Sequence, residues 1–423
     1  MSEVTPRSVL AELASGTKPR RDTYEGWQRY RTTRGQFLAA PILTFTQWRA
    51  MSSSERSLYD LHRTATHVNL PLQETPMSLR VGRLVNRRLR NNALKQNVAT
   101  RPGVMVSGWG YQGKTETVCE VAAAFEDAWL ELHHYLNPDA VDGTNDLHAP
   151  VVYVQTPVTA KPKSTCQAVL DFFGASTRGM SLPRLMQQVA QSLSDHGVKA
   201  LILDDINRLR MHRADDQDTL DLIRAFMSMN VTLILVGVDI PGSGLLRDAR
   251  WDARQRQWVM DPSEHARVHG LEATQTERRF DLVELDRFRT STPEEATSFQ
   301  AHLRGIEAHL RLLKAKPGML TGGAMPEYLM RRTSGVVGVL ERLIEDGAQE
   351  AMDSGKELLD ENLLDEIVIS LDDPSRDPST GEIPPIPGRG TSSRTAIVNK
   401  GARSRRKNTV FDDRGPAAAG TAG

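Results

Sequence analysis

One segment constrains the fold of this chain more than any other: the glycine-rich run from residue 108 to residue 115. It matches the pattern G-x-x-x-x-G-K-[ST] in full. Its residues are Gly108, Trp109, Gly110, Tyr111, Gln112, Gly113, Lys114 and Thr115. Glycines let such a loop curl so that its N–H groups face phosphate oxygens at a helix N-terminus. We therefore expect all eight residues to bind nucleotide, with Lys114 reaching the outer phosphates and Thr115 binding magnesium.

The flanking sequence is what this loop requires. The apolar run Val104-Met105-Val106 precedes it and is typical of a buried strand, and residues 115–133 follow it with helical periodicity. In a chain of 423 residues the pattern alone has a probability of order a few per cent of arising by chance. The strand and helix lower that further, so a phosphate loop is favoured over a turn that binds no ligand.

A second signal lies about 90 residues further on, in Ala200-Leu201-Ile202-Leu203-Asp204-Asp205. A carboxylate at the end of a buried parallel strand, beside a phosphate loop, can hold a magnesium ion, and its neighbour can orient or deprotonate a water molecule. We assign the metal to Asp204 and the water to Asp205. The alternative is that these acids cap a following helix.

Short β-branched runs alternate with helical segments after residue 102. The runs cover residues 104–106, 151–154, 200–203 and 231–238, and segments such as 181–195 have helical spacing. Near-continuous apolar strands that alternate with helices indicate a parallel sheet covered on both faces. The predicted fold class is therefore α/β, with a phosphate-loop core whose parallel sheet is sandwiched by helices.

The chain divides by pattern into four regions. Residues 293–314, 335–354 and 358–371 read as helices without strands, which predicts a small C-terminal helical lid subdomain. Beyond residue 373 Pro, Gly, Ser and Thr dominate, which is typical of disorder. The predicted boundaries are 1–75 for a basic N-terminal extension, 76–290 for the nucleotide-binding core, 291–371 for the lid and 372–423 for a disordered basic tail.

Charge is distributed unevenly along the chain, although 53 basic and 53 acidic residues cancel. Residues 1–101 carry 17 Lys/Arg against 7 Asp/Glu, residues 374–423 carry 9 against 4, and the middle carries 27 against 42. Such asymmetry suggests nucleic acid or another anionic partner, and a solvated surface explains it equally well. The candidate contacts are the arginine-rich helix at residues 78–97 and the basic cluster at residues 400–407.

Composition limits where the protein works. No apolar run approaches the roughly 18 residues that a membrane helix needs, and the N-terminus lacks the apolar stretch of a secretory signal. Cys119 and Cys166 are the only cysteines, which is too few for a disulfide scaffold. We expect a cytoplasmic protein with buried thiols, no membrane partner and no structural zinc.

Two later segments complete the candidate site. Arg278 and Arg279 stand just before the helical region, where an arginine can reach the γ-phosphate of a neighbouring subunit and stabilise transferred charge. The alternative is a surface ion pair. The run Gly335-Val336-Val337-Gly338 opens a helix, and its small residues, Gly338 among them, would let nucleotide or backbone approach closely.

In this order the phosphate loop, LILDD, LILVG, RRF and TSGVVGVLERL resemble the AAA+ ATPases of the TniB/TnsC/MuB type over roughly residues 75–370. That family assists DNA transposition by assembling on DNA and contacting a transposase. The resemblance implies ATP as ligand, phosphates at Gly113, Lys114 and Thr115, magnesium at Thr115 and Asp204, and an arginine finger at Arg279. It also implies self-association in a ring or filament, binding of duplex DNA without strong sequence preference, and a transposase partner.

The sequence departs from that family at two positions. Asp205 stands where Glu is usual, and its side chain is shorter by one methylene, so we expect slow hydrolysis. Val238 stands at the usual polar sensor, with Asp239 next.

Three other functions are compatible with a phosphate loop. A GTPase is excluded because Asp239-Ile240-Pro241-Gly242 lies more than 120 residues after Lys114 and no N-K-x-D motif exists. A nucleotide-dependent signalling or defence switch that does not act on a transposase stays open as the alternative; an appended effector or repeat domain would favour it, and we expect none after residue 371. A helicase or initiator loader would carry a C-terminal DNA-reading helix-turn-helix, whereas the tail has only a short basic cluster.

Overall fold

The computed structural model describes residues 9–10, 13–14, 19–97, 99–138, 148–158, 161–208, 217–240, 249–252, 257–260 and 279–369. All of them belong to one compact unit, Met1–Ile383. The second unit, Pro384–Gly423, lies outside the described residues, and so does the whole tail predicted at 372–423 with its basic cluster.

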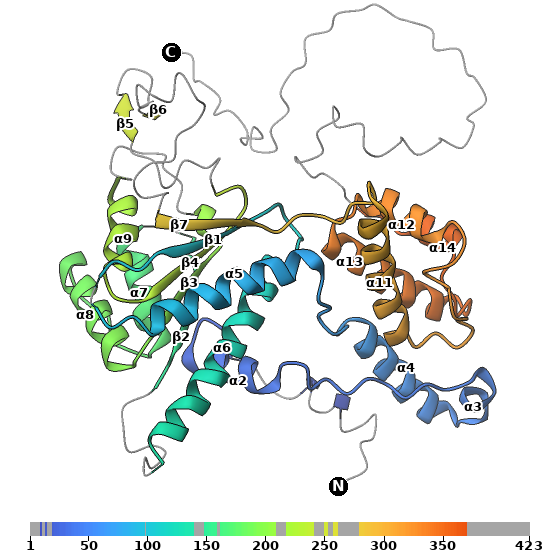
Figure 1. Ribbon diagram of the computed structural model, residues 1–423. Helices are drawn as coiled ribbons and strands as arrows, with labels where there is room; N and C mark the ends of the chain where they lie inside the picture. Colours follow the sequence, from blue (N-terminus) through green and yellow to red (C-terminus); the bar gives the residue numbers. More distant parts are fainter. Residues whose placement is uncertain are drawn as a thin grey trace, which may run out of the picture. The chain divides into compact units, whose positions relative to one another are not determined.

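A five-stranded parallel sheet forms the centre of this unit (Figure 1). Four of its strands coincide with the predicted apolar runs and are almost entirely buried, which confirms the predicted parallel sheet. The fifth, β7, is an edge strand that the sequence did not reveal, because charged residues interrupt its apolar ones. In spatial order the strands are β2 (Val151–Gln155), β3 (Ala200–Asp204), β4 (Thr232–Val236), β1 (Gly103–Ser107) and β7 (Phe280–Glu284).

Helices cover both faces of the sheet, as predicted. The chain moves from β1 to β2 in one direction across the sheet and from β2 through β3 to β4 in the other. Because such crossovers are right-handed, the helix after β1 lies on one face and those after β2 and β3 lie on the other. The first is α6 (Lys114–Leu136), and the others are α7 (Pro162–Phe172), α8 (Leu182–Asp195) and α9 (Gln217–Met227).

The arginine-rich helix predicted at 78–97 is α5 (Pro76–Ala93), which packs against α6 and the strands β1, β4 and β7. It begins one residue after its cap Thr75, whose hydroxyl accepts a hydrogen bond from the Ser78 amide at 3.0 Å. An antiparallel pair, β5 (Ala249–Asp252) and β6 (Gln257–Met260), lies between β4 and β7 in the sequence.

Helices at the N-terminal side contact both the sheet domain and the C-terminal helices. They are α2 (Tyr24–Thr33), α3 (Phe45–Ala50) and α4 (Ser53–His67), and α4 begins with a capping box of Ser52 and Glu55. Trp27 is fully buried and donates a hydrogen bond from Nε1 to Oε2 of Glu126 on α6 at 2.6 Å. Arg63 on α4 forms a buried ion pair with Glu357 at 2.7 Å. Contacts such as these tie residues 19–75 to the rest of the unit.

The three predicted C-terminal helices are present but shorter than expected, and α12 (Met325–Thr333) was not foreseen. The first, α11 (Pro293–His309), ends because Leu310 adopts an extended conformation. The second, α13 (Val337–Asp353), starts after Gly335, whose φ is +72°. The third, α14 (Glu361–Glu366), starts only after Asp360, whose side chain caps it.

A continuous apolar core runs from the strands into the C-terminal helices. Both cysteines are buried in it and free, as predicted. Within the described ranges no helix has the length and apolar character needed to cross a bilayer.

Candidate nucleotide-binding site

The glycine-rich run forms the turn between β1 and α6, as the pattern requires. Gly113 has φ +74°, a left-handed conformation in which a larger residue would be strained, and α6 begins at the next residue, Lys114. No side chain in the described part of the chain caps this helix N-terminus. Its first N–H groups therefore point toward a site suited to an anion.

The loop is braced from inside and from β7. The Trp109 amide donates to Oε1 of Gln112 at 2.7 Å, and the Leu285 amide donates to the Ser107 carbonyl at 2.8 Å. A Cβ atom at Gly108 would lie 2.6 Å from both Oε1 of Gln112 and the Leu285 carbonyl oxygen. Any side chain at residue 108 would therefore force the loop open, and Gln112 acts as a brace within it.

Lys114 bends back over the loop, and its ammonium donates a hydrogen bond to the Trp109 carbonyl. Burial lowers the pKa of Lys114, and the charges of Asp204 and Asp205 oppose that shift. The ammonium thus lies among the loop backbone and the two carboxylates at the end of β3. An ammonium group in this position is suited to bind phosphate oxygens.

Thr115 and Asp204 meet directly. The Thr115 hydroxyl donates to Oδ2 of Asp204 at 2.8 Å, and the Tyr153 hydroxyl donates to the same oxygen at 2.7 Å. Asp204 is buried. Burial and the Asp204 charge raise the pKa of Tyr153, so this phenol stays a donor. Hydroxyl and carboxylate oxygens are the ligands that magnesium prefers, so this pair fits the ion expected here.

Asp205 is held in a strained backbone conformation. Its φ is +52°, which is uncommon for a residue with a side chain, and its amide donates to Oδ1 of Asp204 at 2.9 Å. Nε2 of Gln155 donates to Oδ2 of Asp205 at 3.1 Å. Strain of this kind persists where surrounding structure enforces it and is common at functional sites.

Three residues of this region were missed in the sequence. Tyr153 and Gln155 lie on β2, whose apolar run signals burial and gives no hint that its polar groups reach the carboxylates. Asn207 follows Asp205 by two residues and ties the end of β4 to β3. Its Nδ2 donates to the Val238 carbonyl, and its Oδ1 accepts from the Val238 amide at 2.5 Å. Only the strand order brings these residues together.

Gly338 contacts the phosphate loop. Its amide, in the first turn of α13, donates to the Tyr111 carbonyl at 2.8 Å, and a Cβ atom there would lie 2.7 Å from the same oxygen. The C-terminal helices thus contact the loop through a backbone hydrogen bond, at the residue that the sequence suggested for close approach.

The N-terminal segment and α13 both reach the first turn of α6. Arg21 donates two hydrogen bonds to the Glu116 carboxylate, at 2.5 and 3.1 Å. On α13, burial raises the pKa of Glu341 to about 7, and the charges of Glu345 and Glu116 add to the effect. Residues that are far apart in the sequence therefore surround the start of α6.

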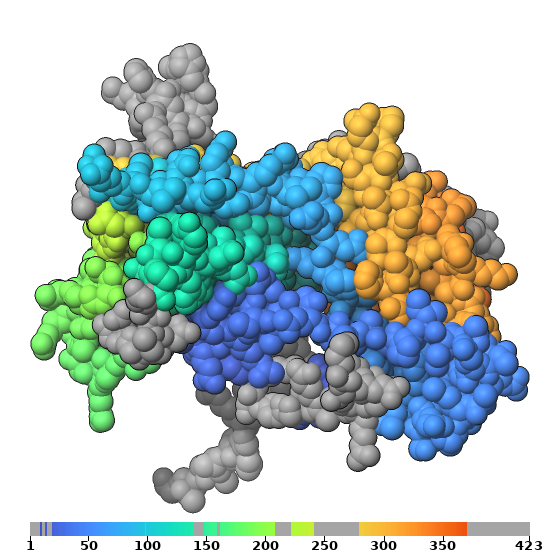
Figure 2. All heavy atoms as spheres, turned by 60° about the horizontal axis from the view of Figure 1, so that its bottom comes forward, coloured from blue at the N-terminus to red at the C-terminus, as the bar shows by residue number. Residues whose placement is uncertain are grey.

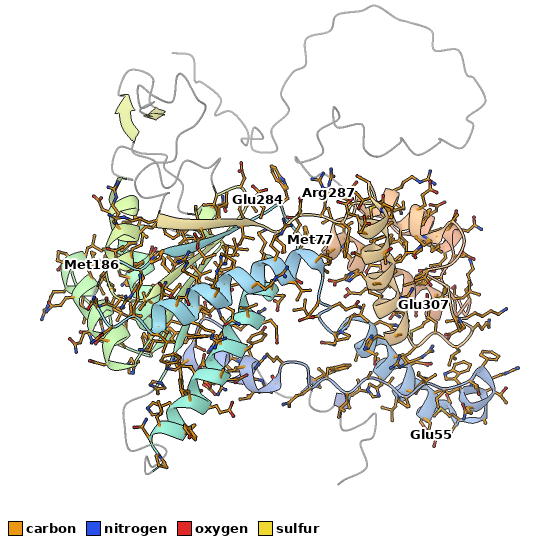
Figure 3. The ribbon with its side chains drawn as sticks, viewed as in Figure 1. Glu55, Met77, Met186, Glu284, Arg287 and Glu307 are labelled. Carbon is orange, nitrogen blue, oxygen red and sulfur yellow. The ribbon has the colours of Figure 1, made fainter. Side chains whose placement is uncertain are left out.

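Arg279 lies away from this chain's own loop. It directly precedes Phe280, which pairs with Gly103 at the start of β1, whereas Glu284 pairs with Ser107 at the end that leads into the loop. Figure 3 labels Glu284 and Arg287, which mark the loop end of β7. About 16 Å of extended chain separates Arg279 from that edge. The side chain is exposed, and Arg278 lies outside the described residues.

Comparison with known proteins supports the fold. Residues 96–240 match a family model described as an AAA domain. The parallel sheet with its flanking helices is that of an AAA+ phosphate-loop core. No curated protein matches the sequence.

Among solved structures, ORC1 of Aeropyrum pernix in complex with DNA shares 13% identity over 71% of this chain and 67% of that chain, with a TM-score of 0.49. ORC2 of the same organism, in ADPNP-ADP complexes, shares 13% over 69% and 68%, with a TM-score of 0.45. Cdc6p of Pyrobaculum aerophilum shares 12% over 68% and 65%, with a TM-score of 0.43.

Proposed function

We propose that this protein is an ATPase that binds ATP and magnesium between its phosphate loop and the end of β3. The observation that carries the proposal is the Thr115–Asp204 hydrogen bond of 2.8 Å beside the uncapped start of α6. This bond joins the hydroxyl of Thr115, in the phosphate loop, to the carboxylate of Asp204, at the end of β3. An anion site and an oxygen pair suited to a divalent cation are adjacent, which is the combination that a nucleoside triphosphate with its metal requires.

In this proposal each residue has a separate task. The loop amides and Lys114 bind phosphate, Thr115 and Asp204 hold magnesium, and Asp205 orients the attacking water. Magnesium, when bound, would neutralise phosphate charge. The strained backbone of Asp205 and its Gln155 contact support a positioned carboxylate, and its short side chain favours slow turnover. Gly338 brings α13 against the loop, so nucleotide binding can be sensed by the C-terminal helices.

Arg279 would act on a neighbouring subunit. It is exposed and stands at the edge of the sheet opposite this chain's own loop, so it is available to the nucleotide of another copy. An arginine supplied in this way stabilises the charge on the transferred phosphoryl group and can raise the rate by several powers of ten. We propose ATP-dependent self-association for this reason.

We propose that the assembly binds duplex DNA and that a transposase is a further partner. The proposal draws on the basic flanks of the chain and on the motif order of the TniB/TnsC/MuB type. The alternative is a signalling or defence switch that uses the same ATP site without DNA or transposase. Binding to DNA distinguishes the two.

One experiment tests assembly and DNA binding together. Sedimentation and fluorescence anisotropy with a labelled duplex are run without nucleotide, with ATP, and with a non-hydrolysable analogue. The proposal expects assembly and DNA binding to require nucleotide and to fall together in Arg279→Ala, but not in Arg304→Ala, which removes an exposed arginine of α11. DNA binding that is tight without nucleotide, or unchanged in Arg279→Ala, would separate DNA contact from assembly. If no condition gives DNA binding, the switch is the better reading.

A further inference from the structure

The outer face of α5 carries a row of arginines that the nucleotide site does not use. Arg80, Arg83, Arg87 and Arg90 are all exposed, and their spacing of three, four and three residues places them on one face of the helix. The opposite face holds Met77, Val81, Val85, Leu89 and Asn92 in the core. We call the four the arginine stripe. In Figure 2, α5 forms a light-blue ridge beside the teal α6.

Four other arginines, on α5 and in the N-terminal segment, have acidic partners. Arg21 pairs with Glu116, Arg31 with Asp127, Arg34 with Glu120 and Asp127, and Arg88 with Asp281. None of the four stripe residues forms an ion pair with any residue that the structure describes. Their charges therefore remain available to an external anion.

The groove beside the stripe favours the same kind of ligand. Arg83 and Arg90 line a hollow of about 1620 Å³ that is walled by α5, α6 and parts of the N-terminal segment. Glu116, Glu120 and Asp127 on its other wall are held by the arginines of the N-terminal segment. These three acids are paired with arginines, so they repel a polyanion lying along α5 less than free carboxylates would; Glu74, which also lines the hollow, has no ion pair among the described residues.

The helix that carries the stripe is firmly anchored. Nδ2 of Asn92 donates to the Pro102 carbonyl at 2.9 Å and to the Thr232 hydroxyl at 3.1 Å. Nε of Arg88 donates to Asp281 on β7 at 2.8 Å. The stripe is thus presented on a rigid element, so little backbone ordering would oppose binding.

The length of the arginine stripe is compatible with the phosphate spacing of duplex DNA. From Arg80 to Arg90 the helix rises about 15 Å. Over that distance one strand of B-DNA presents about four phosphates. Resting on the proposed function, we propose that the arginine stripe binds the phosphate backbone of duplex DNA, independent of sequence, and that each subunit of the assembly contributes one stripe.

The test compares three forms of the full-length protein on a labelled 30-base-pair duplex with a non-hydrolysable ATP analogue. The first replaces Arg83, Arg87 and Arg90 by Gln and the second replaces them by Lys. The third is a matched control with Gln at Arg29, Arg184 and Arg304, which are exposed on α2, α8 and α11. Anisotropy is recorded across a salt series, and sedimentation with the analogue but without DNA reports assembly.

The stripe predicts that the Gln variant assembles like the parent, loses at least about tenfold in DNA affinity, and shows a salt slope shallower by about 3, since each lost phosphate contact removes about 0.9. The Lys variant and the control should stay within a few-fold of the parent. Equal DNA affinity of the Gln variant and the parent would refute DNA binding by the arginine stripe and would leave the proposed function standing. Loss of assembly in the Gln variant would also refute DNA binding by the arginine stripe, because the arginines would then bind an acidic face of a second copy. A parent that binds no DNA refutes the DNA-binding function itself.

Discussion

The hydroxyl of Thr115 donates a hydrogen bond of 2.8 Å to Oδ2 of Asp204, across 89 positions of sequence. The contact joins the first turn of α6 to the end of β3. It brings together the two oxygen groups assigned to magnesium, and Tyr153 and the Asp205 amide hold the carboxylate in place. The part of the site that we propose for magnesium is therefore arranged by the fold itself.

Removing the Thr115 hydroxyl should weaken magnesium-dependent ATP binding. We expect Thr115→Ala to raise the Kd for ATP about tenfold with magnesium and to change it little in EDTA, because the hydroxyl contributes through the metal. Thr115→Ser keeps the hydroxyl and serves as the control. Calorimetric titrations in both buffers measure this. An equal loss in EDTA would mean that Thr115 supports the loop and not the ion.

Replacing Asp205 by Asn should slow hydrolysis at least about tenfold and leave ATP affinity nearly unchanged. The amide keeps the shape of the side chain and loses the charge that handles the proton. Steady-state phosphate release and ATP titration provide the two readouts. Turnover at the parental rate would show that Asp205 is a cap or a support for Asp204.

A side chain at residue 338 should separate α13 from the phosphate loop. A Cβ atom there would lie 2.7 Å from the Tyr111 carbonyl oxygen, so we expect Gly338→Ala to weaken ATP binding about tenfold. Gly82→Ala is the matched control, because Gly82 is also helical and its added Cβ would meet a Val121 methyl at 3.3 Å. ATP titration of both variants, with thermal unfolding as a check of folding, tests this. Parental affinity in Gly338→Ala would exclude a tight contact between helix and loop.

Acid should destabilise the C-terminal helices through a buried histidine. Burial lowers the pKa of His302 to about 4, and neither ring nitrogen has a hydrogen-bond partner among the described residues. The unfolded chain therefore binds a proton below about pH 6.5 that the folded chain excludes. Stability attributable to this residue is present above pH 6.5 and is lost as the pH falls toward 4.

We expect His302→Phe to recover roughly 2 kcal/mol of unfolding free energy at pH 5 relative to its effect at pH 7.5. The ring already packs against Phe288, at a centroid distance of 5.0 Å, so phenylalanine fits the chemistry of the site. Urea titrations at the two pH values measure the difference. A variant with the same pH dependence as the parent would show that His302 is protonated in the fold or titrates as in the unfolded chain.

The sequence predicted the elements whose signal is local. Four strands are continuous apolar runs because both their faces are covered, and the phosphate loop is a contiguous pattern whose glycines have a conformational purpose. The arginine-rich helix α5 was also predicted, although it runs over Pro76–Ala93 and not over residues 78–97. These features were readable without any knowledge of strand order.

Features that depend on the order of the strands in the sheet could not be predicted from the sequence. β7 is an edge strand in which Asp281 and Glu284 interrupt the apolar residues, so no continuous run marks it. Tyr153 reads as one more core residue until β2 pairs with β3, and Arg21 gives no sign that it meets Glu116. The C-terminal helices were predicted too long, because periodicity continues past Leu310, where the backbone becomes extended.

The central claim, that the loop at residues 108–115 binds ATP, is tested most directly by calorimetric titration of the parent and of Lys114→Ala with magnesium and ATP. The lysine supplies phosphate charge and little packing, so the variant should keep its thermal midpoint and lose ATP affinity about a hundredfold, or about 3 kcal/mol. Lys163→Ala, an exposed lysine of α7, is the control. Binding of one ATP per parent chain, with loss only in Lys114→Ala, is the predicted result, and equal ATP affinity in parent and Lys114→Ala would contradict it.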